Sequence, residues 1–190
     1  MVKTNKKIER VAIFGDATAN PGDDFFIKAK ETARLLANNG YIIVNGGGPG
    51  IMLAATLGAK EAGGKAEVVV ISEASKPENY EGVEAENIRL ADKKYVTKNI
   101  ADRTNKLVEI ADAYIIFKGG TGTLSEVGMV WELAKFEYGH HEPLIFVGKE
   151  WDRVVKTIER EMNFEDKEKR VVMTVETPEE VIRALEQAGS

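Results

Sequence analysis

Cysteine and long hydrophobic runs are absent from this sequence of 190 residues. Without cysteine the chain cannot form a disulfide, supply a thiolate metal ligand or use a cysteine nucleophile. This composition suits a reducing cytoplasm, where we expect the protein to be located. The longest apolar runs, such as Val68–Ile71 and Ala113–Phe117, are too short to span a bilayer, and no apolar segment follows the basic N-terminus. We therefore expect neither a secretory signal nor a membrane partner.

Basic residues are also fewer than acidic ones. The chain has 26 lysines and arginines against 31 aspartates and glutamates, a net charge of −5. Nucleic-acid-binding domains usually carry a basic face, so we expect no nucleic acid partner. With 43% apolar and 30% charged residues the composition is that of a globular protein. A chain of this length can bury one core, and we expect a single domain over residues 1–190.

Short apolar runs alternate with longer amphipathic stretches. Strand-like runs lie at residues 10–15, 41–44, 67–71, 87–90, 113–117, 143–147 and 170–174. Helical patterns lie at residues 25–38, 49–62, 97–110, 123–136 and 151–162, and a capping box at residues 177–180 opens a last helix. This alternation predicts an α/β fold, a doubly wound Rossmann-like sheet of about seven mostly parallel strands with helices on both faces. Such sheets bind ligands at the carboxyl ends of their strands.

Three of the predicted strands end in turns that are rich in glycine. They are Gly15-Asp16-Ala17, Gly46-Gly47-Gly48-Pro49-Gly50 and Gly119-Gly120-Thr121-Gly122-Thr123. Glycine lets a turn bring its backbone N–H groups close to a ligand, and a helix N-terminus favours anions. The tight geometry alone explains an isolated turn of this kind equally well. Two such dense turns on one parallel sheet favour a site for a nucleotide or another phosphorylated small molecule.

The better-known nucleotide and hydrolase motifs do not match these turns. A dinucleotide-binding motif would need a third glycine where the sequence has Ile51, counted from Gly46, or Ser125, counted from Gly120. A P-loop (Walker) motif that began at Gly58 would need a lysine six residues later, and the sequence has none there. Ser125 also lacks the flanking glycines of a nucleophile elbow. We therefore exclude an NAD dehydrogenase, a P-loop NTPase and an α/β-hydrolase.

Several polar residues near the turns have both a structural and a functional interpretation. Thr123-x-x-Glu126 matches a capping box, and physical reasoning alone favours this interpretation over an acid–base role for Glu126. Arg103 lies in a helical stretch, where most arginines are solvated or weakly paired, although it could also bind a phosphate or carboxylate. His140 and His141 are adjacent in a polar segment, and we expect no metal site there.

The motif GGTGTLSE at residues 119–126 resembles the Gly-Gly-x-Gly-Thr-x-x-Glu core of the Lonely Guy (LOG) family. These proteins are also called lysine-decarboxylase-like or Rossmann-fold nucleotide-binding proteins. Residues 46–52 resemble the second glycine turn of that family, one residue shorter. Arg103 precedes Asp112 by nine residues, as the helix arginine of the family precedes its next strand. The resemblance extends over residues 11–147.

This resemblance implies an enzyme that forms a homodimer or a higher homo-oligomer and hydrolyses the N-glycosidic bond of a nucleoside 5′-monophosphate without a cofactor. AMP or a cytokinin riboside monophosphate would give the free base and ribose 5-phosphate. By position, Arg103 and Glu126 would be catalytic, since a carboxylate can stabilise an oxocarbenium-like state and an arginine can orient the ribose or phosphate. The phosphate and nucleotide would be bound by Gly15, Asp16, Gly46, Gly47, Gly48, Gly119, Gly120, Thr121, Gly122 and Thr123.

Several positions depart from the family pattern. Asp16 replaces the usual serine after Gly15, Lys118 replaces a proline, and Thr104 replaces a lysine. A carboxylate of Asp16 aimed at the phosphate site would weaken phosphate binding. Trp131 stands five residues after the motif glutamate rather than seven. This spacing resembles a divergent branch near the molybdenum-cofactor carrier proteins, which bind a phosphorylated pterin without hydrolysing it. A non-catalytic nucleotide- or cofactor-binding carrier or sensor is therefore the alternative prediction.

Overall fold

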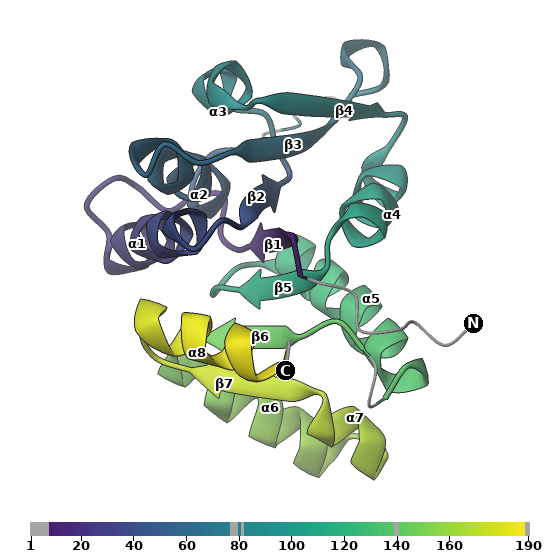
Figure 1. Ribbon diagram of the computed structural model, residues 1–190. Coiled ribbons are helices and arrows are strands. Elements are labelled where there is room, and N and C mark those ends of the chain that lie inside the picture. Colours follow the sequence, from purple (N-terminus) through teal and green to yellow (C-terminus); the bar gives the residue numbers. More distant parts are fainter. Residues whose placement is uncertain (1–7, 77–79, 81, 139–140, 189–190) are drawn as a thin grey trace.

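Seven strands form one sheet in the computed structural model, which describes residues 8–76, 80, 82–138 and 141–188. The strand order is β4-β3-β2-β1-β5-β6-β7, and every neighbouring pair is parallel (Figure 1). The strands are β1 (Arg10–Phe14), β2 (Ile42–Asn45), β3 (Ala66–Ile71), β4 (Lys93–Thr97), β5 (Ala113–Ile116), β6 (Leu144–Val147) and β7 (Val172–Val175). The predicted doubly wound α/β fold is confirmed.

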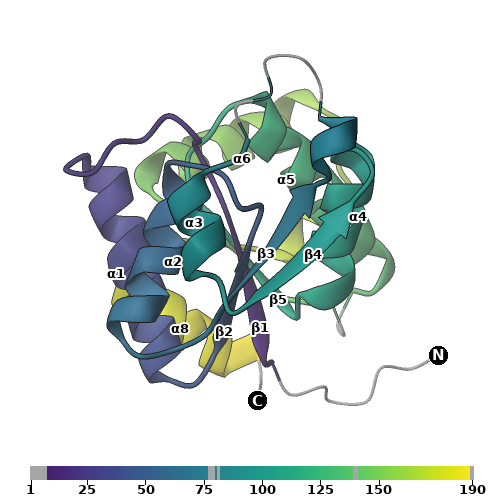
Figure 2. The same cartoon turned by 90° about the horizontal axis from the view of Figure 1, so that it is seen from above.

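Helices cover both faces of the sheet. They are α1 (Asp24–Asn38), α2 (Ile51–Glu61), α3 (Ala85–Leu90), α4 (Ile100–Ile110), α5 (Thr121–Phe136), α6 (Lys149–Glu161), α7 (Asp166–Arg170) and α8 (Pro178–Ala188). Helices α1, α2 and α8 lie on one face, and α4 and α5 lie on the other (Figure 2). Among the described helices, none is both long enough and apolar enough to cross a membrane.

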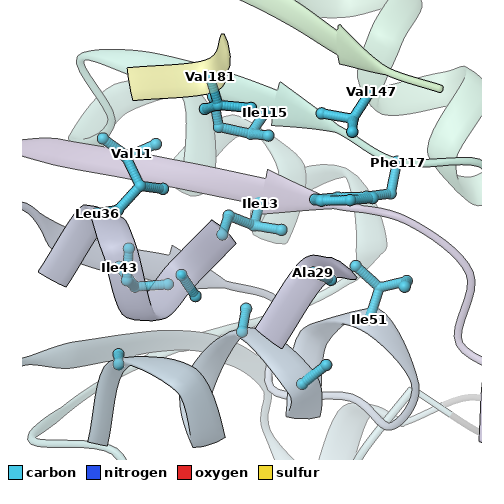
Figure 3. Close-up of a cluster of buried hydrophobic side chains, with 14 of the residues drawn as sticks. Val11, Ile13, Ala29, Leu36, Ile43, Ile51, Ile115, Phe117, Val147 and Val181 are labelled. Carbon is cyan, nitrogen blue, oxygen red and sulfur yellow. The ribbon is translucent and has the colours of Figure 1, made fainter. Parts of the chain in front are cut away.

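Two apolar cores, one on each face, hold the strands in place. In β1, Val11 and Ile13 belong to the core under α1, α2 and α8, whereas Ala12 and Phe14 belong to the opposite core. This division follows from the alternation of side chains along a strand. Figure 3 shows the first core, where Leu36 and Val181 pack toward the strands. Each large apolar side chain buried in this way contributes about 1.5–3 kcal/mol to the stability of the fold. The strands that lead to the glycine turns are therefore held firmly.

The edge of the sheet beyond β3 differs from the prediction. Residues 87–90, predicted as a strand, form the end of helix α3, and the edge strand is β4 instead. The apolar residues of this segment suggested a buried strand. In the structure they belong to a helix whose buried residue is polar, namely Asn87. Strand β4 was missed because it pairs only with β3 and is largely exposed, with Lys93 and Lys94 at its start. Lysine is common on edge strands, where it discourages pairing with other chains.

Some helix boundaries also differ from the prediction. Helix α4 begins at Ile100, not at residue 97, because the side chain of Asn99 accepts a hydrogen bond from the Asp102 backbone. Helix α5 begins at Thr121, two residues earlier than predicted. The short helix α7 was not predicted, and it displaces the start of β7 from residue 170 to residue 172. The capping box that opens α8 is confirmed, since the Thr177 hydroxyl and the Glu180 carboxylate each accept a backbone N–H of the other residue.

Candidate functional site

A cavity of about 250 Å³ lies at the carboxyl ends of the central strands. Its walls come from the turn after β1, the turn after β2, the start of α5, and single side chains of α2 and α4. The segment after β3 adds Tyr80 and Gly82. The turns are joined by backbone hydrogen bonds, because Asp16 donates to the Lys118 carbonyl and accepts from the Ile51 amide. The cavity therefore occupies the place where a doubly wound sheet binds its ligands.

The N-terminus of α5 borders this cavity without a side-chain cap. The N-cap residue is Gly120, and no side chain makes a capping hydrogen bond there in the described structure. Gly120, Thr121 and Gly122 are exposed, and all three line the cavity. The first turn of an uncapped helix presents unpaired N–H groups and the positive end of the helix dipole. This end of the cavity is therefore suited to an anion.

Arg103 and Glu126 form a buried ion pair inside the cavity. The Arg103 Nη2 atom lies 3.7 Å from Glu126 Oε1, and the two side chains are 11% and 10% exposed. The Arg103 Nη1 atom also donates to the Gly46 carbonyl at 3.4 Å, which links α4 to the turn after β2. Both residues line the cavity. The structure thus brings together a cation and a carboxylate that are separated by 23 residues in the sequence.

The ionisation of Glu126 is shifted by its surroundings. Burial raises the pKa of this carboxyl to about 7, and the nearby Arg103 guanidinium limits the rise. A carboxyl with a pKa near neutrality can accept or donate a proton at physiological pH. Glu126 therefore has the properties of an acid–base group.

The capping-box interpretation of Glu126 is wrong. Since α5 begins at Thr121, both Thr123 and Glu126 lie inside the helix rather than at its cap. The interpretation of Arg103 as a solvated surface residue is also wrong, because its side chain is buried against Gly46 and Glu126. In both cases the error arose from local reasoning, which could not show that α4 and α5 meet across the strand ends.

The turn after β2 is held from behind by a buried polar network. The Asn45 amide donates to the Thr56 hydroxyl at 2.8 Å, and that hydroxyl donates to Asn87 Oδ1 at 2.6 Å. Asn87 Nδ2 in turn donates to the Gly48 carbonyl at 2.8 Å, and the Gly47 amide donates to Asn45 Oδ1 at 2.8 Å. The side chains of Asn45, Thr56 and Asn87 are fully buried. Sequence reasoning missed this network, because its members come from β2, α2 and α3.

Most of the predicted site residues line the cavity, and the others do not. Those that line the cavity are Gly15, Asp16, Gly46, Arg103, Gly120, Thr121, Gly122, Thr123 and Glu126. Gly47, Gly48 and Gly119 are not among the described residues that line the cavity. Gly47 has φ +71°, and a Cβ there would lie 2.5 Å from Val70 Cγ1. Tyr80 and Met52 also line the cavity and were not predicted. The sequence offered one signal for Tyr80, because it is the only aromatic residue of the polar segment 72–82 after β3.

The residues that depart from the family pattern have local partners. The Asp16 carboxylate accepts hydrogen bonds from the Thr18 amide at 2.9 Å and from the Thr18 hydroxyl at 3.0 Å. Lys118 is exposed, with its Nζ atom 5.8 Å from the centre of the Phe25 ring. Thr104 is buried, and its hydroxyl donates to the Ile100 carbonyl within α4. None of these three side chains contacts Arg103 or Glu126 through a hydrogen bond or ion pair in the described part of the chain.

The remaining candidates lie away from the cavity. Trp131 is a core residue, 6% exposed, whose indole donates to the Glu168 carbonyl and thereby docks α7. His141 Nδ1 lies 2.9 Å from the Glu142 carbonyl oxygen, whereas His140 lies outside the described residues. Within the described ranges, no group of three or more histidines and carboxylates is placed to hold a metal ion.

Comparisons with known proteins match nearly the whole chain. The model of the family described as LDcluster4, SLOG cluster4 family, matches residues 9–182. An uncharacterized protein of Archaeoglobus fulgidus is 25% identical over 158 residues, which cover 83% of this chain and 95% of that protein. The molybdenum cofactor binding protein of Rippkaea orientalis has a similar structure, with a TM-score of 0.69 and 24% identity over 97% of this chain and 98% of that chain. DNA processing protein A of Helicobacter pylori, which binds single-stranded DNA, has a TM-score of 0.60 and 18% identity over 94% and 80% of the two chains. At these identities the two solved structures show a shared fold.

Proposed function

The chain belongs to the SLOG cluster4 family, and from this premise we propose that it is a nucleoside 5′-monophosphate phosphoribohydrolase. The substrate would be AMP or a related nucleotide, and the products would be the free base and ribose 5-phosphate. The observation that carries this proposal is the buried Arg103–Glu126 pair in a cavity that also contains the uncapped start of α5. This family membership agrees with the LOG-like resemblance of the two glycine turns.

The 5′-phosphate would bind at the start of α5. Backbone N–H groups of the first helical turn and the Thr121 hydroxyl would donate to the phosphate oxygens, and the helix dipole would favour the negative charge. Arg103 would face the ribose side, since one of its nitrogens is engaged with Gly46 and another with Glu126. The glycosidic bond would then lie beside the carboxyl of Glu126.

Hydrolysis adds water across the bond between C1′ of the ribose and the base nitrogen. The hydroxyl of water ends on C1′, and a proton ends on the departing base. The Glu126 carboxylate would accept the proton of the attacking water and stabilise the positive charge that develops on the sugar. With a pKa of about 7, roughly half of this group is ionised at neutral pH. Arg103 would orient the ribose and favour the ionised form of the carboxylate by lowering its pKa.

A ribose 5-phosphate release assay tests this proposal. Purified protein is incubated with AMP, GMP, CMP, UMP and N6-isopentenyl-AMP, and Glu126→Gln is compared with Glu132→Gln. Glu132 is a suitable control because it lies on the same helix and its carboxylate is 55% exposed. We expect Glu126→Gln to lower the rate at least about a hundredfold, the size of an acid–base contribution, and Glu132→Gln to leave it unchanged. Equal rates in the two variants would remove Glu126 from the mechanism.

The second candidate function is a carrier that binds a phosphorylated pterin or nucleotide without cleaving it. It is favoured by the nearly complete structural match with a molybdenum cofactor binding protein. It also agrees with the departures of Asp16, Thr104 and Lys118 from the pattern of the LOG family. Ligand retained intact after long incubation, shown by mass spectrometry of the protein–ligand complex, would favour the carrier over the enzyme.

The proposed assembly is a homodimer that binds no nucleic acid. Helix α5 exposes the apolar side chains of Leu124, Leu133 and Phe136, which are 49%, 45% and 69% exposed, and Leu133 and Phe136 lie on the same side of the helix. Exposed apolar residues gathered on one element are typical of an interface. Light scattering of the wild type and of Phe136→Glu tests the dimer, with a monomeric variant as the expected result. Fluorescence anisotropy with a single-stranded oligonucleotide tests the second point, and the net charge of −5 predicts no binding.

A further inference from the structure

Two polar atoms of the cavity wall are buried and have no hydrogen-bond partner among the described residues. They are the Tyr80 hydroxyl oxygen and the Arg103 Nε atom. Most buried polar atoms of folded proteins are paired, because an unpaired one loses its bonds to water without replacement. Two such atoms in one cavity point to a ligand that supplies the missing bonds.

Tyr80 is held in place from two sides. On one side the Arg103 guanidinium lies over its ring, with Cζ 6.0 Å from the ring centre. On the other side, the tip of the ring lies directly against Gly82, where a Cβ would overlap Cζ and the hydroxyl oxygen of Tyr80. The absence of a side chain at Gly82 is therefore what allows the Tyr80 hydroxyl to occupy its buried position.

Tyr80 and Gly82 lie on the side of the cavity that is formed by the turn after β2, because a Cβ at Gly48 would lie 3.3 Å from the Gly82 carbonyl oxygen. Tyr80 belongs to the segment after β3, and the start of α5 follows β5. Strands β2 and β1 lie between them in the sheet. Arg103 connects the two sides, because its Cζ atom lies 6.0 Å from the centre of the Tyr80 ring and its Nη2 atom lies 3.7 Å from Glu126 Oε1.

We propose that Tyr80 recognises the heterocycle of the ligand and thereby determines which nucleotides the site accepts. The proposal rests on the proposed function, in which the phosphate binds at α5 and the sugar lies beside Glu126. The heterocycle then reaches the end of the cavity that is lined by Tyr80, Gly82 and Met52. An aromatic ring offers a flat wall to a planar base, and a methionine thioether packs well against π-systems.

The two unpaired atoms specify the chemistry of this heterocycle. Arg103 Nε carries a hydrogen and can only donate, whereas the Tyr80 hydroxyl can donate or accept. The ligand must therefore place an acceptor, a ring nitrogen or a keto oxygen, beside the guanidinium. Purines and pterins are planar and carry such acceptors along their edges. Ribose 5-phosphate lacks the planar base and would leave Tyr80 without a contact.

Titration calorimetry in the cold, where turnover is slow, tests this assignment with AMP, GMP and ribose 5-phosphate as probes. The variants are Tyr80→Phe, which removes only the hydroxyl, and Gly82→Ala, whose added Cβ displaces the tip of the Tyr80 ring. Tyr41→Phe is the matched control, because Tyr41 is a partly buried tyrosine that precedes β2 at the opposite end of the sheet.

We expect Tyr80→Phe to weaken the binding of at least one nucleotide roughly three- to tenfold, the effect of one lost hydrogen bond. Ribose 5-phosphate should bind as it does to the wild type, Gly82→Ala should show the same selective loss, and Tyr41→Phe should show none. Unchanged nucleotide affinity in Tyr80→Phe and Gly82→Ala would overturn the role of Tyr80 and leave the proposed function intact. An equal loss for ribose 5-phosphate would overturn it too, because Tyr80 would then act only by supporting Arg103. If the wild type binds none of the three probes, the proposed function fails, and this inference fails with it.

Discussion

The two glycine turns at the centre of the sheet look alike in sequence but differ in how their backbone groups are satisfied. The turn after β2 is backed by the side chains of Asn45 and Asn87, which bind its backbone, and by the Thr56 hydroxyl, which joins these two side chains. The turn before α5 has no such backing, and its N-cap residue Gly120 receives no side-chain hydrogen bond in the described structure. One turn is thus completed by the protein itself, and the other is left open toward the cavity.

This contrast separates two uses of glycine. At Gly47 the glycine is required by the fold, because φ is positive and the Val70 side chain occupies the space of a Cβ. At Gly120 and Gly122 an added Cβ would meet no atom within 4 Å, so packing among the described residues does not require glycine. Glycine without a packing reason at the edge of a cavity is consistent with the close approach of a ligand to the backbone.

Replacing one threonine in each region should give the largest difference. Thr56→Val removes the hydroxyl that joins Asn45 to Asn87 and leaves both amides partly unpaired in the core. We expect it to lower the free energy of unfolding by about 2–4 kcal/mol. Thr121→Val, on the exposed first turn of α5, should change it by less than about 0.5 kcal/mol. Urea denaturation of both variants measures the difference, and equal losses would contradict the contrast between the turns.

The Arg103–Glu126 pair, which connects the two regions, should make stability depend on pH. The pKa of Glu126 is raised from 4.5 to about 7 in the folded protein, so the folded state holds this proton more tightly than the unfolded state. The stabilisation is fully present below pH 4.5 and is lost as pH rises through about 7. This shift corresponds to about 3 kcal/mol. Denaturation between pH 5 and 8 should therefore show the wild type losing stability relative to Glu126→Gln, and parallel curves would argue against the shift.

The same carboxyl should control the activity, which should rise with pH where the stability falls. If the ionised form of Glu126 is the base, kcat/KM should rise with pH and level off above about 7. Arg103→Gln removes the charge that lowers the pKa of Glu126, so its profile should move to higher pH. Initial rates of ribose 5-phosphate release across this range measure both profiles, and identical profiles would mean that another group limits the rate.

Alanine at single glycines should give effects of opposite sign in the two turns. Gly47→Ala imposes a positive φ on alanine and overlaps Val70, and we expect a loss of about 2–3 kcal/mol in unfolding free energy. Gly122→Ala, inside the first turn of α5, should stabilise the protein by roughly 0.5 kcal/mol through higher helix propensity. Thermal unfolding distinguishes the two, and a destabilised Gly122→Ala would show that this turn has a packing requirement of its own.

The smallest effect is expected at the mouth of the cavity. Asp16→Asn removes one negative charge, while its amide oxygen can still accept the Thr18 hydrogen bond. Stability should remain within about 0.5 kcal/mol of the wild type. Ribose 5-phosphate should bind a few-fold more tightly, because like charge near a phosphate is unfavourable. Calorimetric titration checks this, and weaker binding would mean that the Asp16 carboxylate contributes to the site.

Much of the fold could be predicted because the central strands are nearly continuous apolar segments, such as residues 113–116. The edge of the sheet could not, since β4 is polar and is recognised as a strand only through its pairing with β3. Within the site, the glycine turns and the pair Arg103 and Glu126 were identified from motifs. Tyr80 was missed because it lies in a segment without periodicity, and its role depends on contacts with Arg103 and Gly82.

The amino-acid sequence by itself determined the alternation of strands and helices, the positions of the glycine turns and the chemistry available at the strand ends. These are local properties, set by side-chain periodicity and by the conformations that glycine permits. Only the tertiary structure decided that Glu126 is a buried partner of Arg103 and not a helix cap, and that one glycine turn is closed by Asn45, Thr56 and Asn87 while the other is open. Burial, ion pairing and hydrogen-bond satisfaction depend on which distant segments meet, and that is settled only when the sheet and its helices pack together.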